Sequence, residues 1–114
     1  MALARDYKDT IRARAERDPD FAASLMNEAL SSFLGGDSGT ARLILRELVN
    51  STIGFERLAE EMEKPSKSVH RMLSPKGNPT MDNLTSILSI LQDRLDFGIE
   101  VRLSTQGKLL RRTG

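Results

Sequence analysis

The sequence predicts an all-α fold of about five to six helices with one short β-strand near the C-terminus. Apolar residues recur at three- and four-residue spacing through most of the 114 residues, as in helices that bury one face. Hydrophobic residues make up 39% of the chain and aromatic residues only 4%, so we expect a core of aliphatic side chains. This length fits a single domain around one core.

The composition excludes several classes of protein. There is no cysteine, which excludes disulfides and thiolate metal sites. No apolar run approaches the roughly 20 residues of a membrane helix, and the N-terminus MALARDYKD lacks a signal-peptide core, so we expect a cytoplasmic protein. The 17 basic and 16 acidic residues nearly cancel. That balance argues against a general nucleic-acid coat but leaves a site-specific binder open.

Two helices are expected in the N-terminal region, residues 1–36. The first has apolar residues at four-residue spacing, namely Leu3, Tyr7 and Ile11. The second has Asp18 as its cap and Pro19 in its first turn, and it ends at a pair of glycines. Its predicted inward side chains are Phe21, Leu25, Ala29 and Phe33.

Two further helices follow. The first lies within DSGTARLILRELVNSTIGF, with Arg42 and Arg46 on its outer face. Its predicted inward residues are Ala41, Ile44, Leu45 and Leu48. Gly54 interrupts the pattern before a short helix at FERLAEEMEK, whose predicted inward residues are Phe55, Leu58, Ala59 and Met62.

The stretch KPSKSVHRMLSPKGNPT, residues 64–80, holds four Lys or Arg and one His but no carboxylate. It spans a tight turn at Lys64 and Pro65, a second short helix and a loop. Short helix, turn and second short helix are the order of a helix-turn-helix, whose second helix enters the major groove of DNA. An acidic residue there would repel phosphate, so the missing carboxylates fit a DNA-facing surface.

The second short helix divides into an apolar and a polar face. Val69, Met72 and Leu73 lie three and four residues apart and are expected to pack inward. The residues that face outward are Ser66, Lys67, Ser68, His70 and Arg71.

These outward residues and the following loop can recognise DNA. Arg71 and Lys67 can reach guanine acceptors. The hydroxyls of Ser66 and Ser68 can reach phosphate or a base. His70 can donate to phosphate or accept from a base, and it can equally cap or pack. In the loop, Gly77 permits close approach to the DNA backbone. The predicted DNA-binding residues are Lys64, Ser66, Lys67, Ser68, His70, Arg71, Lys76, Asn78 and Thr80.

Two proline residues and a glycine, Pro75, Gly77 and Pro79, exclude helix up to Thr80, which is the expected cap of the last helix. The predicted buried residues of that helix are Leu84, Ile87, Leu88, Leu91 and Leu95.

After this helix the period changes to two. Phe97, Ile99, Val101 and Leu103 alternate with Gly98, Glu100, Arg102 and Ser104, which predicts a strand with one apolar face. A lone strand is not stable in water, and the chain offers no second good strand. The expected partner is the same strand of another copy, which predicts a homodimer. The alternative is an extended tail that lies on the helices.

The predicted organisation has four regions: N-terminal helices at 1–36, a helix-turn-helix DNA-binding domain at 37–96, a dimerising strand at 97–104 and a basic tail at 105–114. The tail can follow DNA phosphate, remain disordered or become ordered on a protein partner.

Other interpretations of these residues remain open. A run of basic residues is also typical of a solvated surface, and helix-turn-helix units also occur without DNA. Catalysis is not expected, because the chain has a single histidine and no cysteine for a nucleophile pair or a metal cluster. Glu60, Glu61 and Glu63 fit a solvated helix face. We expect no cofactor, metal or catalytic residue.

Residues from about 20 to 103 resemble the Cro/repressor-type (Xre) helix-turn-helix regulators, and in particular the antidote proteins (antitoxins) of addiction modules. The resemblance is carried by LRELVNSTIGFERLAEE at 45–61, PSKSVHRMLSPKGNPT at 65–80 and the NLTSILSILQ that follows. The chain departs from the family pattern in its N-terminal helices and at Pro65. Glu63 and Lys64 also stand near the position where such proteins commonly have a glycine in the turn.

This resemblance implies a bundle of helices around a helix-turn-helix and a repressor of its own operon. It implies two partners besides the second copy that the strand predicts: a double-stranded DNA operator and a cognate toxin, commonly an RNase of the RelE-like class. The alternative is a protein-interaction module without specific DNA binding, which would use the surface around Phe21, Phe33 and the terminal strand.

Overall fold

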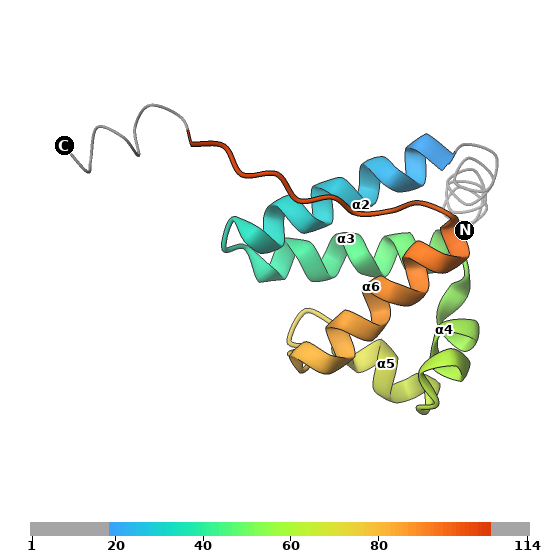
Figure 1. Cartoon of the computed structure of the whole chain (residues 1–114). Coiled ribbons are helices and arrows are strands. Elements are labelled where there is room, and N and C mark those ends of the chain that lie inside the picture. The colour runs from blue at the N-terminus through green and yellow to red at the C-terminus, as the bar shows by residue number, and fades with distance from the viewer. Residues whose placement is uncertain (1–18, 106–114) are drawn as a thin grey trace, which may run out of the picture.

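The computed structural model describes residues 19–105, and this part of the chain contains five α-helices and no strand (Figure 1). The helices are α2 (Pro19–Leu34), α3 (Ser38–Ser51), α4 (Gly54–Met62), α5 (Ser66–Met72) and α6 (Met81–Leu95). The prediction of an all-α fold is confirmed for these residues. The helix expected around Leu3, Tyr7 and Ile11 and most of the basic tail lie outside the described residues.

The helices α2 and α3 form an antiparallel pair, and α4, α5 and α6 gather along one side of α3 (Figure 1). One hydrophobic core joins all five helices. Its largest fully buried side chains are aliphatic, as the composition predicts: Leu48, Leu58, Leu73, Ile87, Leu91, Val49 and Val69. Each such side chain stabilises the fold by about 1.5–3 kcal/mol relative to its exposed state.

The buried face of α2 differs from the prediction. Ala22, Met26 and Ala29 are buried, whereas Phe21 and Leu25 are only half-buried and Phe33 is 40% exposed. Small side chains such as Ala22 and Ala29 let the helix axes of α2 and α3 approach closely, so the aromatic side chains lie beside this contact rather than in it.

A glycine with a positive φ and the cap of α3 define the loop between α2 and α3. Gly36 has a φ of 97°, which an L side chain rarely adopts. Asp37 then caps α3, since its carboxylate accepts the backbone N–H of Thr40 at 3.0 Å and the Thr40 hydroxyl at 2.7 Å. The hydroxyl bond and then the backbone bond hold the pKa of Asp37 below its ordinary value of 3.8.

The helix α6 is fixed at its start and near its end. Thr80 is the cap, as predicted, because its hydroxyl oxygen accepts the backbone N–H of Asn83 at 3.1 Å. Near the end of α6, Arg94 forms an ion pair with Glu61 of α4. Ile87 and Leu91 are buried, and the other predicted core residues of this helix are half-buried.

The strand predicted at 97–104 is not found; the segment is an extended tail that runs along α2 (Figure 1). Phe97 and Ile99 are half-buried against the core. The backbone N–H of Ile99 donates to the side-chain oxygen of Gln92 at 3.1 Å, so α6 provides the bond that a neighbouring strand would provide. The first two apolar residues of the alternating pattern, Phe97 and Ile99, therefore pack on the helices rather than in a sheet.

Candidate nucleic-acid interface

The helices α4 and α5 are joined by the three residues 63–65. Glu63 ends α4 in the left-handed conformation, with φ 57° and ψ 44°. The backbone N–H of Lys64 returns to the carbonyl of Ala59 at 3.0 Å, and that of Glu63 to Glu60 at 3.1 Å. This bond pattern closes a helix end tightly. A positive φ favours glycine, but here it is adopted by Glu63.

We expect Glu63→Gly to raise the free energy of unfolding by about 0.5–1 kcal/mol, because glycine adopts a positive φ without the steric cost of a Cβ. Urea unfolding of the two proteins measures the difference. Glu60→Gly, within α4, is the matched control and should destabilise the protein by about 0.5–1 kcal/mol. If Glu63→Gly were destabilising like the control, the left-handed turn would not be under strain.

The helix α5 has a buried face and an exposed face. Val69 and, at its C-terminal end, Leu73 are buried in the core, and Met72 is half-buried, as predicted. The side chains on the opposite face keep full or partial access to solvent: Lys67, His70 and Arg71 are exposed, and Ser66 and Ser68 are half-buried. Each of the outward residues predicted on α5 is therefore at least partly accessible to solvent.

His70 also packs against α4. Its ring stacks on Phe55, with 4.0 Å between ring centroids and 21° between ring planes. Phe55 is buried and His70 remains exposed, so the imidazole covers the edge of the core while its nitrogens can still reach a ligand. The contact joins the start of α4 to the C-terminal half of α5.

The loop after α5, residues 73–80, presents three of the predicted residues. Lys76, Asn78 and Thr80 are exposed. The Thr80 oxygen already accepts a bond as helix cap, which leaves its O–H as a donor. Gly77 is buried, and its missing side chain faces α5 rather than solvent. The close approach that Gly77 permits is therefore to the end of α5, and the expectation that it serves the DNA backbone is corrected.

Arg42 is a residue of this region that the sequence pattern missed. It was expected to face solvent, but it is half-buried and donates from Nε to the carbonyl of Ser74 at 3.1 Å and from Nη2 to the carbonyl of Pro75 at 3.0 Å. These bonds hold the loop against α3. No local pattern could have found them, since the partners lie 32 and 33 residues apart in the chain.

We expect Arg42→Gln to lower the free energy of unfolding by about 1 kcal/mol, because the shorter amide cannot bridge two loop carbonyls. Urea unfolding measures this change. Arg46→Gln is the matched control, since Arg46 lies one turn further along α3 and makes no side-chain bond within the described residues. Equal stability of the two variants would contradict a stabilising role for the bonds from Arg42 to the loop.

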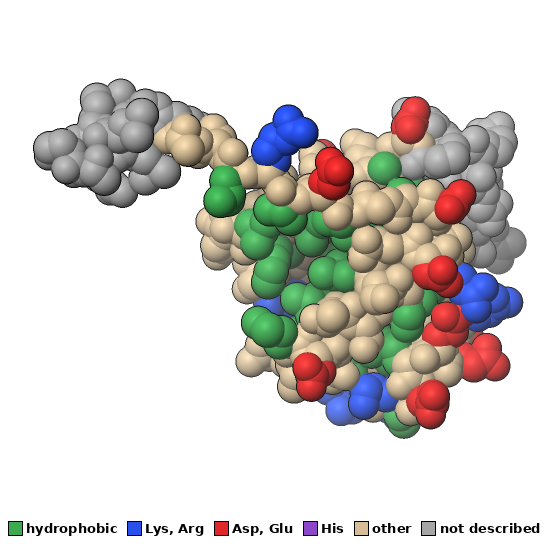
Figure 2. All heavy atoms as spheres, in the orientation of Figure 1, with side chains coloured by type: hydrophobic (Ala, Val, Ile, Leu, Met, Phe, Trp, Pro, Cys, Tyr) green, Lys and Arg blue, Asp and Glu red, His purple; other side chains and the backbone are tan. Residues whose placement is uncertain are grey.

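The basic side chains around α5 have acidic side chains as neighbours. The five basic or imidazole side chains of residues 64–80 are all exposed. The neighbouring helix α4 contributes the exposed acids Glu56 and Glu60, and Figure 2 shows Asp and Glu beside Lys and Arg over the α4 and α5 end of the molecule. The surface formed by α4 and α5 is thus of mixed charge, with the stretch that lacks acids confined to residues 64–80.

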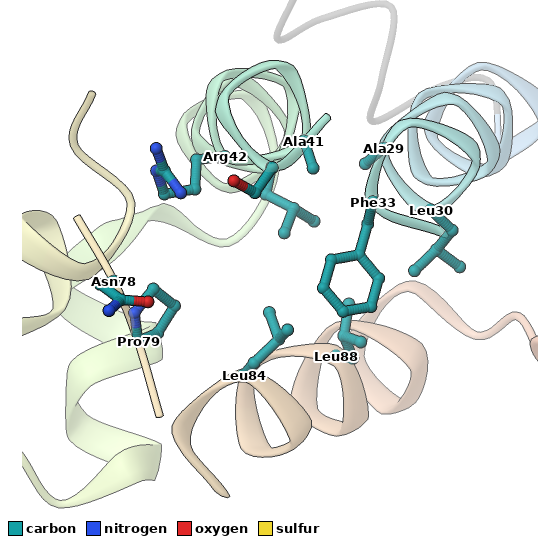
Figure 3. A pocket seen from close by; sticks show the side chains of 11 residues that line it. Ala29, Leu30, Phe33, Ala41, Arg42, Asn78, Pro79, Leu84 and Leu88 are labelled. Atoms are coloured by element: carbon teal, nitrogen blue, oxygen red, sulfur yellow. The ribbon is translucent and has the colours of Figure 1, made fainter. Parts of the chain in front are cut away.

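A small apolar cavity of about 110 Å³ lies behind the loop. Figure 3 shows Phe33 of α2 and Leu84 and Leu88 of α6 pointing into it, with Arg42 and Asn78–Pro79 at its other end.

Other kinds of site receive no support in residues 19–105. Within that range no cluster of His, Cys, Asp or Glu could hold a metal ion. None of the described helices has the length and apolar character needed to cross a membrane. Comparison with protein-family models, curated proteins and solved structures found no match to this chain.

Proposed function

We propose that this protein is a sequence-specific DNA-binding transcriptional regulator of the Cro/repressor type. The observation that carries the proposal is the division of helix α5: Val69 and Leu73 are buried in the core, whereas its fully exposed side chains are the cationic Lys67 and Arg71 and the imidazole of His70. The tight turn at Glu63 and the stacking of His70 on Phe55 support a fixed helix-turn-helix.

In this proposal α5 enters the major groove, which is about 12 Å wide and accepts one helix. Arg71, Lys67 and Ser68 contact base edges, and Ser66 and His70 contact phosphate or bases nearby. The remaining predicted residues, Lys64, Lys76, Asn78 and Thr80, contact backbone phosphates and set the position of the protein on the duplex.

The regulator acts as a homodimer whose two recognition helices enter adjacent major grooves ~34 Å apart on a palindromic operator. Following the family resemblance, it is a cytoplasmic antitoxin that represses its own operon and neutralises an RNase-type toxin. This part of the proposal depends on the sequence motifs at 45–61 and 65–80.

The test is binding of the purified protein to a fluorescent fragment of the DNA upstream of its own gene, at two salt concentrations and against a scrambled competitor. We expect specific binding that weakens steeply with salt, because phosphate contacts release counterions. Absence of binding, or binding that the scrambled DNA removes equally, would refute the DNA-binding function.

A second candidate function, binding of a partner protein without DNA, is favoured by the apolar residues exposed at the end of α2. Phe33 is 40% and Leu34 66% exposed. Co-expression with the product of the adjacent reading frame, followed by size-exclusion chromatography, tests it. A stable complex together with failure of the DNA-binding test would favour this candidate.

A further inference from the structure

The C-terminal segment changes character at residue 100. Phe97 and Ile99 are half-buried against the core, whereas Val101 is 71% and Leu103 88% exposed. In Figure 1 the segment follows α2 and then leaves the body of the molecule. Two aliphatic side chains are therefore exposed on an extended backbone, and such a segment can pair with another strand.

The backbone of this segment has an open edge. Ile99 directs its N–H to Gln92. In an extended chain successive N–H groups point to opposite sides, so those of Glu100 and Arg102 point away from Gln92. Within residues 19–105 these two N–H groups have no hydrogen-bond partner. This edge can accept another strand.

The sequence of the segment is complementary to itself when it runs antiparallel about Val101. In that register Glu100 lies opposite Arg102 of a second copy, and Arg102 opposite its Glu100, so the dimer contains two Glu100–Arg102 pairs. Ile99 lies opposite Leu103 in the same way, and Val101 meets itself. The backbone N–H and C=O groups of Glu100 and Arg102 also point toward the partner strand in this register. Each Glu100–Arg102 pair therefore exchanges two backbone hydrogen bonds across the ribbon.

We propose that residues 98–104 form the interface between two copies of this chain, as an antiparallel two-stranded ribbon centred on Val101. Side chains alternate along a strand, so Ile99, Val101 and Leu103 share one face of the ribbon. The groove between this segment and α2 is lined by apolar residues such as Leu30 and Leu34 and by polar ones such as Asn27 and Ser31. An isolated ribbon is marginal in water, and this groove supplies the apolar support that it needs.

Charge-swap variants of the full-length chain test the register. Each single variant, Glu100→Arg or Arg102→Glu, places like charges opposite each other twice per dimer. We expect each to raise the dimer dissociation constant about tenfold to a hundredfold, measured by sedimentation equilibrium at low salt. In an equimolar mixture, two basic side chains of one variant face two acidic side chains of the other, and the affinity of the parent should return. Recovery on mixing also shows that each variant is folded.

Matched controls are Glu47→Arg and Arg57→Glu, which change exposed charges on α3 and α4 and should leave the dissociation constant unchanged. A parent protein that stays monomeric, single variants that dimerise like the parent, or a mixture no tighter than its components would each overturn the proposal. The measurement uses no DNA, so its outcome is separate from that of the DNA-binding test.

Discussion

Replacing Gly77 with alanine is expected to destabilise the protein by about 1–3 kcal/mol, the typical cost of forcing an atom into a packed site. A Cβ at this position would overlap the carbonyl oxygens of Arg71 and Met72 at the end of α5. These are backbone atoms, so the conflict is relieved only by moving the loop or the helix. Urea unfolding measures the loss of stability.

We also expect Gly77→Ala to bind DNA more weakly than the parent. Lys76 and Asn78 flank Gly77, so a shift of the loop moves both predicted phosphate contacts. Gly39→Ala is the control: its Cβ meets only ordinary contacts in the first turn of α3, and alanine there should stabilise by about 0.5–1 kcal/mol. Unchanged stability of Gly77→Ala would mean that the loop does not pack against α5 in solution.

Replacing Arg71 with alanine is expected to weaken binding to the specific operator by about 1–3 kcal/mol and to relax discrimination at one base pair. The guanidinium is exposed on α5 and makes no bond within the described residues, whereas the Arg71 carbonyl accepts the Ser74 hydroxyl at 2.8 Å. The substitution removes the side chain and leaves that carbonyl in place, so the fold should be unaffected. Titrations against the operator and its single-base variants measure the change.

Lys76→Ala provides the comparison within the same interface. It removes one phosphate contact, so it should weaken binding about equally on all sequences and reduce the slope of log affinity against log salt by about 0.9. If Arg71→Ala and Lys76→Ala both bound the operator as tightly as the parent, neither residue would lie in the interface. If Arg71→Ala behaved like Lys76→Ala, Arg71 would contact phosphate rather than a base.

Local sequence patterns predicted most of this fold. Apolar spacing located the helices in the described residues, and the cap residue Thr80 and the prolines at 75 and 79 located their limits. The apolar face of α5 was predicted because Val69 and Leu73 are four residues apart, and residues at this spacing lie on the same face of a helix. Both are buried.

The predictions failed where the outcome depends on residues distant in the chain. Which face of α2 is buried depends on its close packing against α3. The small side chains of Ala22 and Ala29 fit this contact better than their larger neighbours do. The segment predicted as a strand has an apolar alternation that suits either a strand partner or a helix surface, and α6 provides Gln92 to bind it. Arg42 was assigned to solvent because its two acceptors lie in a loop that no helical period can place.

The bonds of Arg42 have a consequence for the order of folding. They join positions 32 and 33 residues apart, so they form only after a long loop of chain has closed, whereas the turn at Glu63 closes over a few residues. The loop that presents Lys76 and Asn78 therefore reaches its final shape late, once α3 has docked. A peptide of residues 53–96 would contain every predicted DNA contact and still lack the arginine that sets the loop.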